Sequence, residues 1–106
     1  MNVIQNAIHL ISSFSEEFEK NGIKSNNELK LKQYIDDTLK SLKNYHVVNN
    51  KVYITLEKFY QSSSMMIGLS NITLNTSAKN AWRNYDKFHY EYVKPNLKLY
   101  GNTLIL

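Results

Sequence analysis

The feature that most constrains this chain is a helical periodicity, in which apolar side chains return every three or four residues along four successive segments. Side chains at that spacing share one face of an α-helix. The 106 residues include only three Gly and one Pro, whereas all-β domains need more of both for their turns. We therefore expect an all-α fold. The periodicity predicts helices at about residues 3–20, 26–45, 50–68 and 76–94.

Local signals support the first helix boundaries. Asn21-Gly22 predicts the end of the first helix, because glycine adopts the left-handed conformation without a Cβ penalty. Ser25 followed by Glu28 has the spacing of a capping box, in which each side chain satisfies an amide of the first helical turn. The second helix should begin there.

The last third of the chain is divided by a link and a proline. Residues 71–76 show the β-branched alternation of a short extended link. Asn75 or Thr76 is suited to cap the fourth helix. Pro95 disfavours the helical conformation of the residue before it, so the fourth helix should end there. Residues 96–106 form a tail, extended or folded back, that is too apolar to stay in water.

Four amphipathic helices with short connections bury their apolar faces most simply as an antiparallel four-helix bundle. The length suits a single domain over residues 1–106, with a structured C-terminal tail, and an apolar content of 42% suits a globular protein. We expect it to be a monomer.

The sequence also bears on location. Residues 1–10 lack a basic region and are interrupted by polar side chains, so they do not resemble a signal peptide. No apolar run approaches the roughly 20 residues that span a bilayer. Cysteine is absent, which fits a reducing compartment. We expect a cytoplasmic protein, in part at the inner face of the membrane.

Residues that carry catalytic or metal chemistry do not cluster in this sequence. His9, His46 and His89 are far apart, none belongs to a helical metal-binding pair, and we expect two of them at the surface or its rim. No glycine-rich phosphate loop is present. We expect no enzymatic activity, no catalytic residues, no cofactor and no metal.

The second half of the chain holds the excess positive charge and many aromatic residues. Residues 47–106 carry seven Lys or Arg and three Asp or Glu, which accounts for the net charge of +4. A basic ridge is predicted on the fourth helix, beside its aromatic face. Its members, Lys79, Arg83 and Lys87, recur at every fourth position. Tyr, Trp and Arg are enriched where proteins bind one another. The candidate partner-binding residues are Lys79, Trp82, Arg83, Lys87, Tyr90, Tyr100, Leu104 and Ile105.

The architecture resembles the immunity proteins that protect bacteria from pediocin-like (class IIa) bacteriocins. These are cytoplasmic four-helix bundles of similar length with a basic surface and a structured tail. The local match lies at the junction of the third and fourth helices, where the family shows an apolar helix end, a short Ile/Leu-x-Phe/Leu-Thr link and a new helix. Here that junction reads Leu69-Ser70-Asn71-Ile72-Thr73-Leu74-Asn75-Thr76-Ser77-Ala78.

The resemblance implies a partner. It implies that the protein recognises the membrane permease of the mannose phosphotransferase system when bacteriocin is bound, and blocks the pore from the cytoplasmic side. The C-terminal half would decide which bacteriocin is resisted. The fourth helix departs from the family in being more aromatic.

Other classes of function stay open. A basic half also suits an anionic membrane surface. A helical partner or chaperone-like subunit of a Gram-positive toxin secretion system is one alternative, although Trp82 lies inside a helix rather than in the Trp-x-Gly turn of such proteins. A small nucleic-acid-binding regulator is another. We do not favour nucleic acid, because no helix-turn-helix is recognisable and the net charge of +4 is modest.

Overall fold

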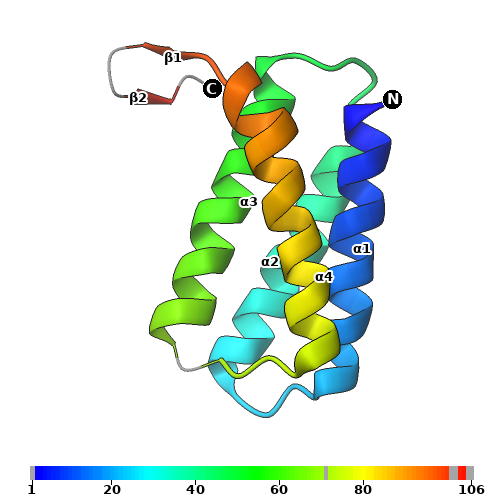
Figure 1. The fold of residues 1–106 in the computed structure, drawn as a ribbon, viewed down its shortest axis with the longest axis vertical. Coiled ribbons are helices and arrows are strands. Elements are labelled where there is room, and N and C mark those ends of the chain that lie inside the picture. Colours follow the sequence, from blue (N-terminus) through cyan, green and yellow to red (C-terminus); the bar gives the residue numbers. More distant parts are fainter. Residues whose placement is uncertain (1, 71, 101–102, 105–106) are drawn as a thin grey trace.

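The protein is an all-α, up-and-down bundle of four antiparallel helices in a computed structural model that describes residues 2–70, 72–100 and 103–104. The predicted fold class is confirmed (Figure 1). Each helix begins and ends within a residue or two of its predicted bounds, except the fourth at its C-terminal end. The helices are α1 (Val3–Asn21), α2 (Asn26–Asn44), α3 (Asn50–Leu69) and α4 (Thr76–Phe88).

The bundle encloses one hydrophobic core, to which all four helices contribute. Phe14, Ile35, Phe59 and Tyr85 are each fully buried, and they come from α1, α2, α3 and α4 in turn. Backbones approach closely between α1 and α2, α1 and α4, and α2 and α3. Between α3 and α4 the large rings of Phe59 and Tyr85 lie 5.2 Å apart, edge to face. These rings fill the space between α3 and α4.

A glycine ends α1 and polar side chains cap the start of α2, as the sequence predicts. Gly22 has a φ of +94°, a conformation that a side chain would strain. The Ser25 hydroxyl accepts a hydrogen bond from the Glu28 amide at 3.2 Å, and the Glu28 carboxylate accepts one from the Lys24 amide at 3.1 Å. The carboxylate thus reaches one residue further back than in a standard capping box.

The link before α4 is attached to the end of α1 by one side chain. The Asn21 amide group donates to the Thr73 carbonyl at 2.9 Å, and its oxygen accepts from the Asn75 amide at 2.7 Å. Ile72 and Leu74 are buried while Thr73 is exposed, which is the predicted alternation of an extended link. The Asn75 side chain then caps α4 by accepting from the Ala78 amide. The start of α4 is therefore held in place.

The fourth α-helix ends before Pro95 as predicted, but it ends already at Phe88, and helical turns of other kinds continue past the proline. After α4 the chain continues into a π-helical turn, η1 (His89–Val93), and a 3-10 turn, η2 (Lys94–Asn96). Lys94 keeps helical angles, with φ −57° and ψ −44°, and its amide donates to the His89 carbonyl. Pro95 lies in the first turn of η2, where the missing N–H of proline costs no hydrogen bond.

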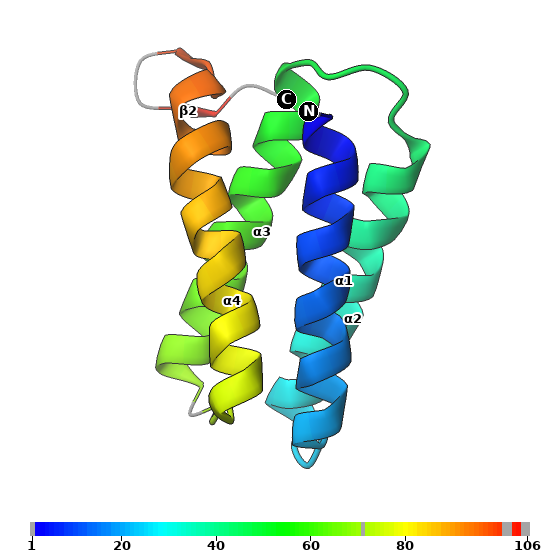
Figure 2. The same ribbon diagram turned by 45° about the vertical axis from the view of Figure 1, so that its right-hand side comes forward.

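The described part of the tail forms a small hairpin beside the start of α3. Strand β1 (Leu99–Tyr100) pairs antiparallel with β2 (Thr103–Leu104), with Leu99 opposite Leu104. The Lys98 amide donates to the Asn50 side chain at 3.0 Å, which ties the start of the hairpin to the first residue of α3. The hairpin lies at the end of the bundle rather than along its length (Figures 1 and 2).

Candidate functional site

An apolar pocket with a basic rim opens where α3 ends and α4 begins. Its volume is about 290 Å³. Trp82 is half-buried in it, and the buried side chains of Ile72 and Leu74 bring the link into its wall. Lys79 and Arg83 are both exposed, and neither forms an ion pair with a described residue. The pocket is lined by Ile67, Ile72, Thr73, Leu74, Lys79, Trp82 and Arg83.

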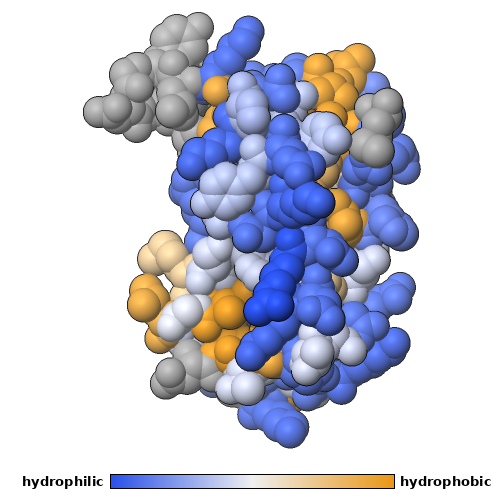
Figure 3. All heavy atoms as spheres, viewed as in Figure 1, coloured by the Kyte–Doolittle hydropathy of each residue, from blue (hydrophilic) through white to orange (hydrophobic). Residues whose placement is uncertain are grey.

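Two further apolar side chains are exposed on the last turns of α3. Met65 is 61% exposed and Leu69 is 77% exposed, which are large values for apolar side chains. In Figure 3, hydrophobic atoms gather at the lower ends of α3 and the link, beside strongly hydrophilic atoms over α4. Exposed apolar patches with a polar border are typical of binding surfaces.

Three aromatic rings form a stack above the pocket, between α3 and α4. The Tyr60 ring lies nearly parallel to Trp82, with centroids 5.8 Å apart and an interplanar angle of 11°. On its other face Tyr60 stacks against His89, at 3.7 Å and 4°. Tyr90, which is 52% exposed, meets Tyr60 edge-on at 6.1 Å. We call Trp82, Tyr60 and His89 the ring stack.

A buried pair of titratable groups holds the inner end of the ring stack. His89 Nε2 lies 2.6 Å from Glu57 Oε1, and both side chains are buried. Gln61 donates to the other carboxylate oxygen at 2.8 Å. His89 Nδ1 is buried and has no hydrogen-bond partner among the residues that the structure describes. The pair fixes the histidine ring against Tyr60 and attaches η1 to α3.

The two tyrosines closest to this pair have raised pKa values. Burial is the main reason that the pKa of Tyr60 lies well above its ordinary value, and the neighbouring Asp86 and Tyr90 add to the shift. Burial also raises the pKa of Tyr85, with the Glu57 charge contributing. The Tyr85 hydroxyl donates to the Leu56 carbonyl at 2.8 Å. Both phenols are therefore held in the neutral form.

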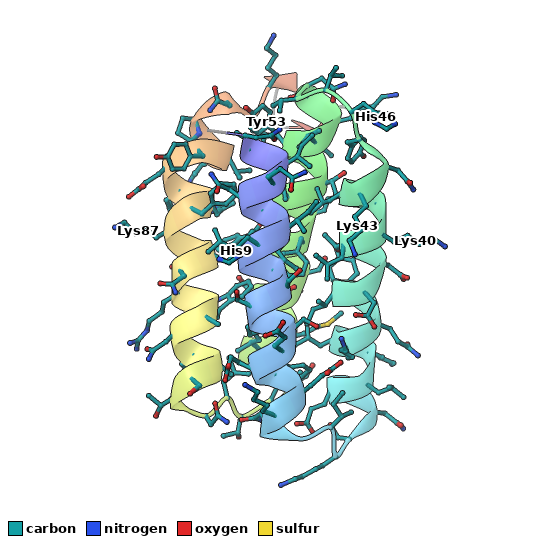
Figure 4. The ribbon with its side chains drawn as sticks, turned by 90° about the vertical axis from the view of Figure 1, so that its right-hand side faces the viewer. His9, Lys40, Lys43, His46, Tyr53 and Lys87 are labelled. Atoms are coloured by element: carbon teal, nitrogen blue, oxygen red, sulfur yellow. The ribbon has the colours of Figure 1, made fainter. Side chains whose placement is uncertain are left out.

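The structure brings together some of the predicted binding residues and separates others. Lys79, Trp82 and Arg83 meet at the pocket, and Tyr90 lies at the far end of the ring stack. Lys87 faces a different hollow between α4 and α1, which it shares with His9 (Figure 4). Eight residues turn a helix by about 80° beyond two full turns, which moves Lys87 away from Lys79.

The tail residues among the predicted binding set are only partly placed. Tyr100 lies in β1 and Leu104 lies in β2, at the end of the bundle away from the pocket. Ile105 lies outside the described residues.

Sequence reasoning missed Glu57, Tyr60 and the burial of His89. Glu57 and Tyr60 are three residues apart, so they share the side of α3 that faces α4, and that spacing was the available signal. The partner of Glu57 is 32 residues away, and no local pattern connects them. His89 is only 2% exposed. His9 and His46 are exposed, as two of the three histidines were expected to be.

The described residues also bear on metal binding and on membrane spanning. They contain no group of three or more His, Asp or Glu side chains placed to hold a metal ion. None of their helices is both long enough and apolar enough to cross a membrane.

Comparison of the chain with protein-family models, with curated proteins and with solved structures finds no match. The residues of the pocket themselves define what it can accept. Its walls suit an apolar side chain, and its two rim cations suit a carboxylate beside that side chain.

Proposed function

We propose that this chain binds another protein through the pocket between α3 and α4, and that it serves as a bacteriocin immunity protein. One observation carries the proposal: Trp82 is half-buried in an apolar pocket whose two rim cations, Lys79 and Arg83, have no described carboxylate partner. Trp and Arg dominate protein-binding hot spots, because they bury a large area and retain a polar contact.

The immunity role implies a particular binding partner for this pocket. Part of the pocket wall comes from the segment that carries the resemblance to pediocin-like immunity proteins, namely Ile72, Thr73 and Leu74. The proposed partner is the mannose phosphotransferase permease with bacteriocin bound, contacted from the cytoplasmic side. An apolar and acidic segment of that complex would enter the pocket.

The proposal predicts different outcomes for two sets of substitutions on the same helix. Lys79→Gln with Arg83→Gln removes the rim cations while keeping helix propensity, so the fold should be unchanged. Losing two charge-assisted contacts should weaken binding by at least tenfold. Protection of a sensitive strain against a panel of pediocin-like peptides is measured at equal expression, and it should fall.

Lys87→Gln is the matched control, because Lys87 is an exposed cation of α4 that does not line the pocket. It should leave protection intact. Equal loss with both variants would contradict the pocket as the binding site. Full protection by the double variant would do the same. If the unsubstituted chain gives no protection against any peptide in the panel, the immunity role is wrong.

A further inference from the structure

The excess positive charge is concentrated at one end of the folded bundle, and the lysines there come from both halves of the sequence. One end contains the start of α1, the end of α2, the α2–α3 loop, the start of α3 and residues 91–98. This end carries five lysines and Glu91 as its only described carboxylate. We call it the basic end. Its lysines are Lys40, Lys43, Lys51, Lys94 and Lys98.

The opposite end is electrically balanced. Residues 16–30 and 66–79 surround the turns at that end, and their described members include four lysines and four glutamates. The net positive charge of the described residues therefore acts mainly at one pole of a molecule that is 38 Å long. Such a pole orients a protein in front of an extended anionic surface.

The lysines of the basic end are free to meet an external anion. All five are exposed, and none forms an ion pair with a described residue. Lys94 Nζ lies 5.0 Å from the centroid of the Tyr90 ring, a contact that leaves its charge unneutralised. In Figure 4, Lys40 and Lys43 project from the upper part of α2, with His46 above them in the loop.

Exposed apolar side chains lie among these lysines. Val47 is 65% exposed and Val48 is 43% exposed, in the loop between Lys43 and Lys51. Apolar side chains next to lysines suit a lipid surface, where the apolar groups enter the headgroup boundary and the cations stay among the phosphates. Nucleic-acid backbones offer phosphates but no such apolar layer, so this composition favours lipid.

We propose that the basic end docks on an anionic lipid membrane, with the long axis of the bundle standing away from the surface. The apolar pocket between α3 and α4 lies toward the other end, so docking does not cover it. This inference does not rest on the proposed partner of that pocket.

Co-sedimentation with vesicles tests the docking. The full chain should bind vesicles of phosphatidylcholine with phosphatidylglycerol at low salt, and should not bind phosphatidylcholine alone. Each lysine near an anionic surface contributes about fivefold to the partition coefficient, so Lys51→Gln, Lys94→Gln and Lys98→Gln together should lower it on the order of 100-fold. Val47→Ser with Val48→Ser should lower it by about tenfold.

The matched control is Lys20→Gln, Lys24→Gln and Lys30→Gln, which removes the same charge from the balanced end. It should change the partition coefficient much less than the basic-end variant does. Circular dichroism verifies that each variant folds. The proposal is overturned by equal binding to neutral and anionic vesicles, by no binding to either, or by equal losses in the two triple variants. Tighter binding to duplex DNA than to anionic vesicles at the same salt also overturns it.

Discussion

Glu57 and His89 are the two buried titratable side chains that connect α3 with the turn after α4. They contact each other at 2.6 Å, and the histidine ring supports Tyr60, which in turn supports Trp82. A buried residue thus sets the orientation of one at the surface. The orientation of Trp82 in the pocket depends on Glu57 through two ring contacts.

Glu57→Ala should therefore destabilise the protein and disturb the pocket together. Leaving His89 Nε2 without its partner costs about 1 to 3 kcal/mol of unfolding free energy. Trp82 is the only tryptophan, so its emission reports on the stack directly. We expect a shifted emission maximum and a lower urea midpoint. Glu16→Ala, at an exposed position of α1, should change neither by a measurable amount. An unchanged emission maximum in Glu57→Ala would contradict the dependence of Trp82 on this pair.

At the scale of the elements, one side chain at the end of α1 attaches the link that leads into α4. Asn21 contacts the link through both its donor and its acceptor. The link in turn supplies two walls of the pocket, Ile72 and Leu74. The geometry of the pocket is therefore coupled to the C-terminal end of α1.

Asn21→Ala removes both hydrogen bonds while leaving the helices themselves intact. Two such bonds contribute about 1 to 3 kcal/mol, and we expect a loss of that size in chemical unfolding. Hydrogen exchange should show faster exchange of the Asn75 amide, which donates to this side chain. Asn80→Ala, at an exposed site within α4, should instead be neutral or slightly stabilising. If Asn21→Ala is equally neutral, the link is held by its buried side chains alone.

The helices themselves could be predicted because their signals are local. The spacing of Ile4, Ile11 and Phe18 and the cap at Ser25 depend only on nearby residues, and each prediction is confirmed. Pro95 misled because the rule for the preceding residue is a preference that Lys94 overrides, since Lys94 keeps helical angles and Pro95 lies in the first turn of η2, where its missing N–H costs no hydrogen bond. The Glu57–His89 contact could not be predicted, since it depends on how α3 and η1 meet in space. The pocket could be predicted in part, through Lys79, Trp82 and Arg83.

The whole molecule has one core and two electrostatically different ends. Charge counted along the sequence placed the excess in residues 47–106, yet Lys40 and Lys43 join it in space because α2 ends where α3 begins. Up-and-down topology brings alternate helix ends together, so charges from distant segments combine at one pole.

A shared core predicts unfolding in one transition. Ile35 and Phe59 are fully buried in it, on α2 and α3. Replacing either by Ala should cost about 2 to 5 kcal/mol, because the surrounding helices cannot collapse into the space that is left. Calorimetry should show a single transition at a lower temperature for each variant. Losses below about 0.5 kcal/mol at both positions, as is typical of surface sites, would contradict the shared core.

The π-helical turn at His89–Val93 has a consequence for the direction of the chain beyond it. The hydrogen bond of a π-helical turn spans one more residue than that of an α-helical turn, so the chain after it is out of phase by about 100° with a continuous α-helix. Without that additional residue, η2 and the hairpin would leave α4 on another side of the bundle, and Lys94 and Lys98 would turn with them. One inserted residue can thus redirect a terminal segment while the helices that precede it keep their packing.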